Sequence, residues 1–192
     1  DKLVQNPDYV FIGETPGKHE VEASEPFVGR AGYVLKFWLL KAVPQLQVAY
    51  ERKKVSLCNV LRCLPPEVHG RAYPTGEARA TAEGCCRQYD NFGSAHTIVL
   101  FGEAAQSLHF GKELFEEDAS DRRLGRDLKG VMGRIGRVYA KDGRTYVFCV
   151  HPAAILRQPA LVEHGQAALR IAARVDAISE PEFVEWNVGC QS

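Results

Sequence analysis

Short apolar runs alternate with longer stretches of helical periodicity along this chain. Runs rich in β-branched and aromatic residues predict strands at residues 9–12, 55–60, 97–101 and 145–150. Apolar residues at helical spacing predict helices at residues 32–43, 76–92, 103–110 and 159–178. Because strands that alternate with helices form parallel sheets through helical crossovers, this pattern predicts an α/β fold with a parallel sheet.

A β-hairpin is predicted at the last strand. Lys141-Asp-Gly143 separates two strand-like pieces, residues 137–140 and 144–150, and Asp-Gly is a strong hairpin signal. The chain has 192 residues, 45% of them hydrophobic, which is enough for one domain with its own core. We place this domain at residues 1–178 and expect residues 179–192, with glutamates around an isolated tryptophan, to form a tail or linker.

Glycines and polar residues follow the ends of the four predicted parallel strands. The segment Gly13 to Gly17 follows the first strand, and Asn59 lies near the end of the second. Gly102-Glu103 follows the third strand and His151-Pro152 follows the fourth. Because the carboxyl ends of parallel strands share one edge, where open α/β sheets bind ligands, these residues are expected to line one pocket.

The overall charge argues against a protein that is basic over its whole surface. Lysines and arginines number 24, as do aspartates and glutamates, so the net charge is zero. One local run is basic, and its interspersed glycines predict a loop that could contact phosphates. The alternative, a charged loop that is simply solvated, stays open. The run consists of Arg122, Arg123, Arg126, Lys129, Arg134 and Arg137.

The sequence also bears on the location of the protein and on its thiols. No apolar window is long enough to span a membrane and no signal peptide is visible, so an intracellular location, cytoplasm or nucleoid, is expected. Three of the six cysteines, Cys58, Cys85 and Cys149, lie in or beside apolar segments, as buried reduced thiols often do. No two cysteines have the spacing Cys-x-x-Cys.

Three motifs carry the candidate chemistry. The first begins with Phe11-Ile-Gly-Glu-Thr-Pro-Gly17 and continues in Glu25-Pro-Phe-Val-Gly-Arg-Ala-Gly32. Its glycine-bracketed turns let backbone amides approach a bound group closely. The second is Asn59-Val-Leu-Arg-Cys-Leu-Pro-Pro66, and the third is His151-Pro-Ala-Ala-Ile-Leu-Arg157.

In this order, the motifs resemble those of the uracil-DNA glycosylase superfamily, and most of all its family 4, the iron–sulfur type. The resemblance covers residues 7–172. It implies a three-layer α/β/α sandwich with a central, mainly parallel four-stranded sheet. It also implies a base-excision-repair hydrolase that releases uracil from single- or double-stranded DNA. A preference for another base, hypoxanthine or mismatched thymine, is a weaker alternative.

One alternative of a different class stays open. The same fold could serve as a non-catalytic or specialised DNA-binding module within a larger replication or defence protein.

The resemblance also implies roles for individual residues. Gly13, Phe27 and Asn59 would bind a flipped uracil, with Phe27 stacked on the base. The amide of Asn59 presents a donor and an acceptor, which suits the O4 and N3–H edge of uracil and not the edge of cytosine. His151 would donate a hydrogen bond to uracil O2, where negative charge develops as the bond breaks.

Two residues of the first motif are candidates for handling the attacking water. Glu14 stands at the motif glutamate, where it would orient the water or stabilise the sugar cation; a solvated turn residue is the alternative. Thr15 stands where other branches carry a water-positioning aspartate and where family 4 usually has alanine or glycine. This departure leaves the identity of the water-activating residue open.

The residues after His151 would probe the duplex. Ile155 and Leu156 are apolar candidates for the wedge that fills the space of an extruded base. Arg157, together with Arg134 from the basic run, would contact phosphates. The alternative for the start of this segment is a histidine that only caps a helix beginning with proline.

A [4Fe–4S] cluster is the cofactor that the resemblance implies. Cys63 matches one of the four family ligands and Cys86 another, with Cys85 as the alternative to Cys86. The remaining two family ligands form a Cys-x-x-Cys pair near the amino terminus. Because such a cluster normally needs four thiolates, either the pair lies upstream of Asp1 or this branch has lost the cluster.

Overall fold

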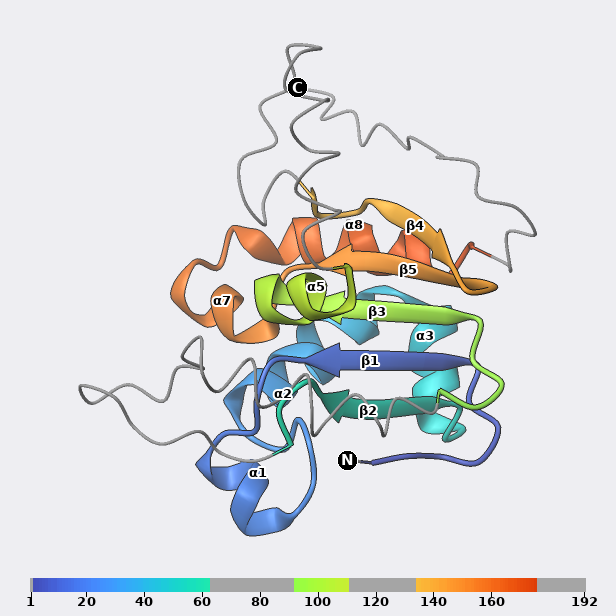
Figure 1. The fold of residues 1–192 in the computed structure, drawn as a ribbon. Coiled ribbons are helices and arrows are strands. Elements are labelled where there is room, and N and C mark those ends of the chain that lie inside the picture. Colours follow the sequence, from blue (N-terminus) through green and yellow to red (C-terminus); the bar gives the residue numbers. More distant parts are fainter. Residues whose placement is uncertain (1, 63–91, 111–133, 176–192) are drawn as a thin grey trace.

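The computed structural model describes residues 2–62, 92–110 and 134–175. Its centre is a five-stranded sheet in the order β2-β1-β3-β5-β4, in which only β4 runs antiparallel to its neighbour (Figure 1). The strands are β1 (Tyr9–Gly13), β2 (Val55–Asn59), β3 (Thr97–Phe101), β4 (Val138–Lys141) and β5 (Arg144–Cys149).

The predicted strands are confirmed, and the sheet has one strand more than the four expected. The additional strand is β4, the first arm of the predicted hairpin, which pairs with β5 from Lys141↔Arg144 to Val138↔Val147. It joins the sheet because β5 leaves its edge open on that side, and an unpaired edge exposes backbone donors and acceptors.

Helices cover both faces of the sheet. In Figure 1, α5 lies on the near face, whereas α3 and α8 lie behind the strands. The helical elements are α1 (Lys18–Ala23), α2 (Arg30–Tyr33), η1 (Val34–Leu39), η2 (Leu40–Ala42), α3 (Pro44–Glu51), α5 (Gly102–Phe110), α7 (Pro152–Arg157) and α8 (Leu161–Ala172). The three-layer α/β/α arrangement is therefore confirmed.

The alternation of side chains along the strands creates two cores. Phe11 and Val99 face the layer of η1, α3 and α8, while Ile12 and Leu100 face the opposite layer, where Ala105 of α5 packs. Successive residues of a strand point to opposite faces, so a strand that is buried on both sides reads as a continuous apolar run. This is why the strands stand out in the sequence.

The predicted helices are confirmed in part. The expected helix at residues 32–43 is a composite of α2, the π-helical η1 and the 3₁₀-helical η2. α5 and α8 match their predictions in position, but α8 begins at Leu161 and ends at Ala172. The expected helix at residues 76–92 lies outside the described residues, except for Phe92. Within the described ranges, every helix falls short of the length and apolarity that a membrane crossing needs.

Candidate active site

The strand order changes direction between β1 and β3, which makes their carboxyl ends a topological switch point. The chain passes from β1 to β2 on one side and then to β3 on the other side of β1. Ligands of open α/β sheets bind at such a switch point. Gly13 ends β1 at this place, and the turn that carries Glu14 and Thr15 follows it directly.

Asn59 lies beside Gly13 because β1 and β2 end in register. The two residues are Cα partners in the parallel pair. Pairing continues past the strands: Val60 N–H donates to the Gly13 carbonyl at 3.0 Å, and Leu61 N–H donates to the Glu14 carbonyl at 3.0 Å. The turn after β2 is thereby held along the turn after β1, and Asn59, partly buried, is kept at the edge.

Gly13, Asn59 and Phe27 meet at one point. A Cβ atom added at Gly13 would overlap Asn59 Oδ1 and would lie 2.8 Å from Phe27 Cζ. Glycine is therefore required at the end of β1 for the amide of Asn59 and the ring of Phe27 to approach the strand this closely. The structure thus brings together the three residues predicted to bind the base.

Phe27 has an unusual backbone conformation. Its φ is +56°, in the left-handed region that residues other than glycine rarely adopt. The residue is 4% exposed, and its ring packs against Phe101 of β3 in an edge-type contact with centroids 6.0 Å apart. A Cβ atom at Gly32 would overlap the Phe27 carbonyl, so the first turn of α2 closes over the Phe27 backbone.

His151 follows β5 and caps α7. Its Nδ1 accepts a hydrogen bond from Ala153 N–H at 3.2 Å, and Pro152 occupies the first helical position. The imidazole and the ring of Phe27 are nearly parallel, with centroids 6.4 Å apart and planes inclined by 29°. Burial, with a smaller contribution from the charge of Arg157, lowers the pKa of His151 to about 4; Glu20 acts in the opposite direction.

These observations set the protonation of His151. The imidazole is neutral at physiological pH, and Nδ1 is an acceptor, so the proton is on Nε2. The site therefore combines a neutral Nε2–H donor, the planar amide of Asn59 and the ring of Phe27 at one sheet edge. Glu14 and Thr15, both partly buried, lie at the same edge in the turn after β1.

Comparison with known proteins assigns this arrangement to a family. The family model for the uracil DNA glycosylase superfamily matches residues 2–173. The chain belongs to the uracil DNA glycosylase superfamily. The expected resemblance to family 4 is confirmed by relatives that carry the name Type-4 uracil-DNA glycosylase.

Three of these relatives illustrate the range of similarity. The protein of Pyrobaculum aerophilum is 36% identical over 154 residues, which are 79% of this chain and 69% of the relative. That of Archaeoglobus fulgidus is 26% identical over 183 residues, 95% of this chain and 83% of the relative. That of Sulfurisphaera tokodaii is 30% identical over 158 residues, 80% of this chain and 63% of the relative.

Two residues of this superfamily member were predicted to touch DNA, and the structure contradicts both predictions. Ile155 is 0% exposed and belongs to the core, so it cannot serve as a wedge. Arg134 is 3% exposed, so its guanidinium is not presented to a phosphate backbone. Of the remaining basic run, Arg137 is partly buried, and residues 122–129 lie outside the described residues.

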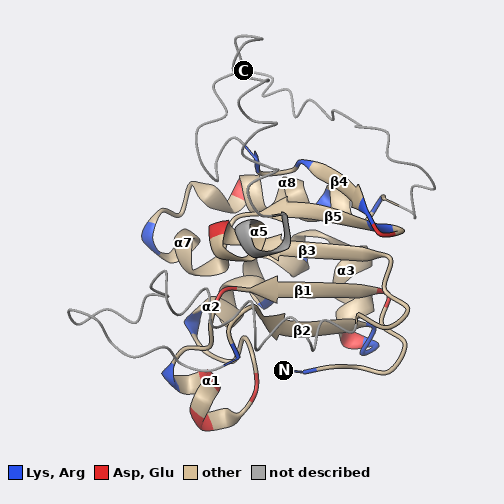
Figure 2. Cartoon of the chain, viewed as in Figure 1, with Lys and Arg blue, Asp and Glu red and all other residues tan. Residues whose placement is uncertain are grey.

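The other DNA candidates keep the exposure that their role needs. Leu156 is partly buried and packs against the core from the surface, and Arg157 is exposed at the end of α7. Figure 2 shows basic residues on α1, α2 and α7, which stand beside the carboxyl edge of the sheet. Arg30, at the start of α2, is exposed and was not singled out as a contact from the sequence, although it lies within the first motif.

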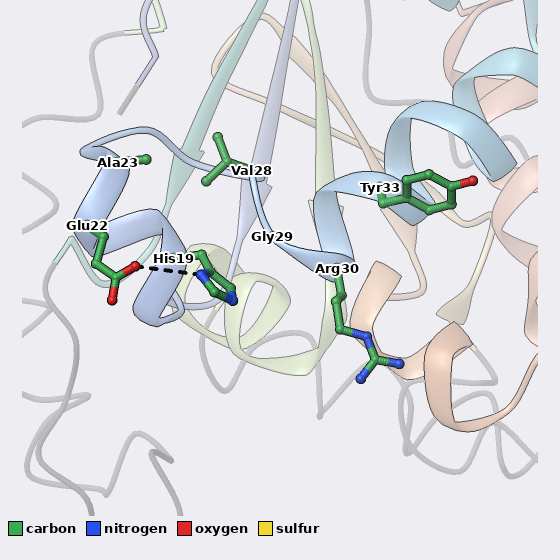
Figure 3. A pocket seen from close by; sticks show the side chains of 7 residues that line it. All are labelled: His19, Glu22, Ala23, Val28, Gly29, Arg30 and Tyr33. Carbon is green, nitrogen blue, oxygen red and sulfur yellow. Dashed lines mark ion pairs between the residues drawn. The ribbon is translucent and has the colours of Figure 1, made fainter.

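An open surface cavity of about 780 Å³ lies beside Phe27, one of the residues predicted to bind the base. It is lined by His19, Glu22, Ala23, Val28, Gly29, Arg30 and Tyr33. Figure 3 shows the side chain of Arg30 extending from α2. His19 lies on α1, where its Nδ1 is 3.6 Å from Oε2 of Glu22. The cavity adjoins the segment that carries Phe27, but its walls include none of the residues predicted to bind uracil.

The described residues do not fit an iron–sulfur cluster. Within residues 2–62, 92–110 and 134–175, no three histidine, cysteine, aspartate or glutamate side chains are grouped as metal ligands. Cys58 and Cys149 are buried, as predicted, and their thiols lie against the carbonyls of Phe11 and Gly165. Burial raises the pKa of Cys149, which disfavours the thiolate that iron binds. Cys63, Cys85 and Cys86 lie outside the described residues.

Proposed function

We propose that this chain hydrolyses the N-glycosidic bond of deoxyuridine in DNA, releasing uracil and leaving an abasic site. The observation that carries the proposal is the meeting of Gly13, Phe27, Asn59 and His151 at one sheet edge. These residues come from four separate segments, and each supplies a different part of what excision of a base requires. Relatives named Type-4 uracil-DNA glycosylase support the same activity.

Recognition of the base rests on Asn59 and Phe27. The Asn59 amide donates to uracil O4 and accepts from N3–H, whereas cytosine presents an amino group and an unprotonated nitrogen at these positions. If cytosine enters instead, the partly buried amide of Asn59 is left without its hydrogen-bond partners. Leaving such a polar group unpaired costs more free energy than the loss of a single contact. Phe27 supplies a flat apolar face for stacking, typically worth about 1–3 kcal/mol per base.

Bond cleavage relies on the neutral imidazole of His151. As the bond between C1′ and N1 breaks, its electron pair moves onto the uracil, and negative charge collects at O2. Nε2–H of His151 donates to this oxygen and stabilises the leaving anion. A donor that is already oriented by the Ala153–Nδ1 hydrogen bond needs no rearrangement as the charge develops.

Water completes the reaction at the sugar. Its oxygen bonds to C1′ of the sugar cation, and it loses a proton to a base or to solvent. Glu14 is the proposed residue for orienting this water, because it lies in the turn after β1 at the same edge. Thr15 contributes a hydroxyl next to Glu14. A lower excision rate in Thr15→Ala would mean that this hydroxyl assists the water, and a higher rate would mean that Thr15 crowds it.

DNA is bound through the elements around the edge. A flipped uracil must leave the stack, which costs a few kcal/mol, and less from a mismatch or a single strand. Leu156 is the proposed wedge, and the exposed Arg157 and Arg30 are proposed phosphate contacts. Because its substrate is DNA, we infer an intracellular location, the cytoplasm or nucleoid.

The cofactor remains a separate proposal. Cys63 and Cys86 are the proposed thiolate ligands of a [4Fe–4S] cluster, which would need two more thiolates. Iron and acid-labile sulfide, measured in protein isolated without oxygen, test this directly. Four of each per chain support the cluster, and their absence contradicts it.

The activity is tested with oligonucleotides that carry a single uracil. Single- and double-stranded forms are incubated with the protein, and abasic sites are then cleaved with alkali. The same oligonucleotides with cytosine or thymine in place of uracil are the controls. Cleavage at uracil alone supports the proposal, and DNA binding without any cleavage contradicts it.

A further inference from the structure

One carboxylate joins the two glycine turns of the first motif. Glu20 Oε2 accepts a hydrogen bond from Gly17 N–H at 3.1 Å, and Oε1 accepts one from Gly29 N–H at 2.8 Å. Gly17 precedes α1 and Gly29 precedes α2. Because a glycine has no side chain to cap a helix, Glu20 satisfies a backbone donor at the start of both helices.

The bond to Gly29 goes beyond ordinary capping of α1. A glutamate three residues into a helix commonly reaches back to the N-cap amide, and the bond to Gly17 is of this kind. Gly29 lies nine residues further along the chain, outside that helix. Oε1 of Glu20 therefore closes a loop of chain that runs from Glu20 to Gly29. This loop includes the turn at the end of α1, where Glu25 N–H also donates to the Glu20 carbonyl at 3.1 Å.

Phe27 lies inside this closed loop and needs such support. Its φ of +56° is costly for an aromatic residue, and such conformations persist only where the surrounding structure holds them. Gly32 admits the Phe27 carbonyl on one side. On the other side, the Glu20–Gly29 bond, partly buried, holds the backbone two residues after Phe27.

We propose that Glu20 is a positioning residue, whose carboxylate joins the Gly17 and Gly29 turns and thereby fixes Phe27 for stacking on the base. This inference rests on the proposed function, since Phe27 matters only if a base enters the site. Both carboxylate oxygens of Glu20 are occupied by backbone amides of the protein itself. Its role is geometric, because both oxygens are needed and the side chain must span the two amides.

The first test is a double-mutant cycle on single-stranded uracil DNA. Glu20→Ala is expected to lower kcat/KM about tenfold in the native background and less than about twofold in Phe27→Ala. The matched control is Glu22→Ala, which removes another carboxylate of the same helix. Within the described part of the chain, this carboxylate pairs with exposed His19, and its loss should leave kcat/KM within about twofold.

Two conservative variants separate geometry from charge. Glu20→Gln keeps the length and one oxygen acceptor, so it should retain one of the two hydrogen bonds and an intermediate kcat/KM. Glu20→Asp keeps the charge, but its side chain is one methylene shorter and cannot span both amides. It should therefore keep at most one of the two hydrogen bonds, so its kcat/KM should lie clearly below that of the native chain. Equal losses in both backgrounds of the cycle, or full activity in Glu20→Asp, would overturn the proposal.

A readout that does not need activity keeps the two proposals apart. Hydrogen exchange of the Gly29 amide should be faster in Glu20→Ala than in the native chain, and unchanged in Glu22→Ala. If the native chain excises no uracil, the proposed function fails whatever the exchange shows. If Gly29 exchanges equally slowly with and without the Glu20 carboxylate, the positioning role fails whatever the activity.

Discussion

The backbone N–H of Ala153 donates a hydrogen bond to Nδ1 of His151 across 3.2 Å. This bond caps α7 and at the same time leaves the imidazole proton on Nε2, the nitrogen proposed to donate to the base. A cap and a catalytic donor are alternative interpretations of the His-Pro pair in the sequence. In this structure the two interpretations are compatible, because the cap leaves the proton on Nε2, where the proposed donor role requires it.

The first prediction concerns pH. The pKa of His151 is lowered to about 4 from 6.5, mainly by burial. The unfolded chain therefore binds this proton more tightly, so the stability linked to His151 is full above pH 6.5 and is lost as the pH falls towards 4.

Excision should persist until the pH approaches 4, because the neutral imidazole is the active form. NMR titration measures this pKa, with His151→Gln assigning the signal; a midpoint near 6.5 would contradict the account.

The second prediction concerns the end of β1. Gly13→Ala places a methyl group against Asn59 Oδ1 and 2.8 Å from Phe27 Cζ, so both must move away. We expect kcat/KM for uracil DNA to fall at least about tenfold. Gly143→Ala is the control, because a Cβ there meets nothing within 4 Å although its φ is +71°. It should lower the melting temperature and leave kcat/KM unchanged. Native kcat/KM in Gly13→Ala would refute the close contact.

The third prediction concerns the choice of base. Asn59→Asp keeps the size of the side chain but replaces the amide donor with a second acceptor. Uracil O4 then faces an oxygen, so excision of uracil should fall about 100-fold. The ratio of uracil to cytosine excision should fall as well, because a carboxylate can accept from the cytosine amino group. An unchanged ratio, measured on matched single-stranded oligonucleotides, would remove Asn59 from base recognition.

The fourth prediction separates the two neighbouring apolar residues of α7. Leu156→Ala should lower kcat/KM about tenfold on double-stranded DNA and less than about twofold on single strands, since only a duplex has a gap to fill. Ile155→Ala should instead lower the free energy of unfolding by about 2–5 kcal/mol, because Ile155 is fully buried. Any loss of activity in that variant should be equal on both substrates. A strand-dependent loss in Ile155→Ala would reverse this assignment.

The strands and their convergence could be predicted because each has a strong local signal. β1, β2, β3 and β5 are buried on both faces and read as apolar runs, and a parallel arrangement brings their carboxyl ends to one edge. The rule that parallel strands end at the same edge of a sheet is enough to place Asn59 and His151 near Gly13. The short helix α1 and the helix α3 were missed: α1 buries no residue, and the Pro44 signal at the start of α3 was not used.

The errors concern side chains whose exposure depends on packing. Ile155 and Leu156 are adjacent apolar residues, and only the way α7 sits on the core decides that Ile155 points inward. Arg134 belongs to a basic run, yet the fold buries it. Glu20 has the spacing of a capping glutamate after Gly17, but its bond to Gly29 depends on the path of the chain between them.

The most direct test of the central claim is His151→Ala, assayed for both excision and binding of uracil DNA. The single-turnover rate should fall about 100- to 1,000-fold, because one preorganised donor to the developing oxyanion is lost. The dissociation constant for DNA with a non-cleavable uracil analogue should change less than about threefold, since His151 acts mainly as the bond breaks. Circular dichroism confirms that the variant is folded. Equal losses of rate and of binding, or no loss of rate, would contradict the account.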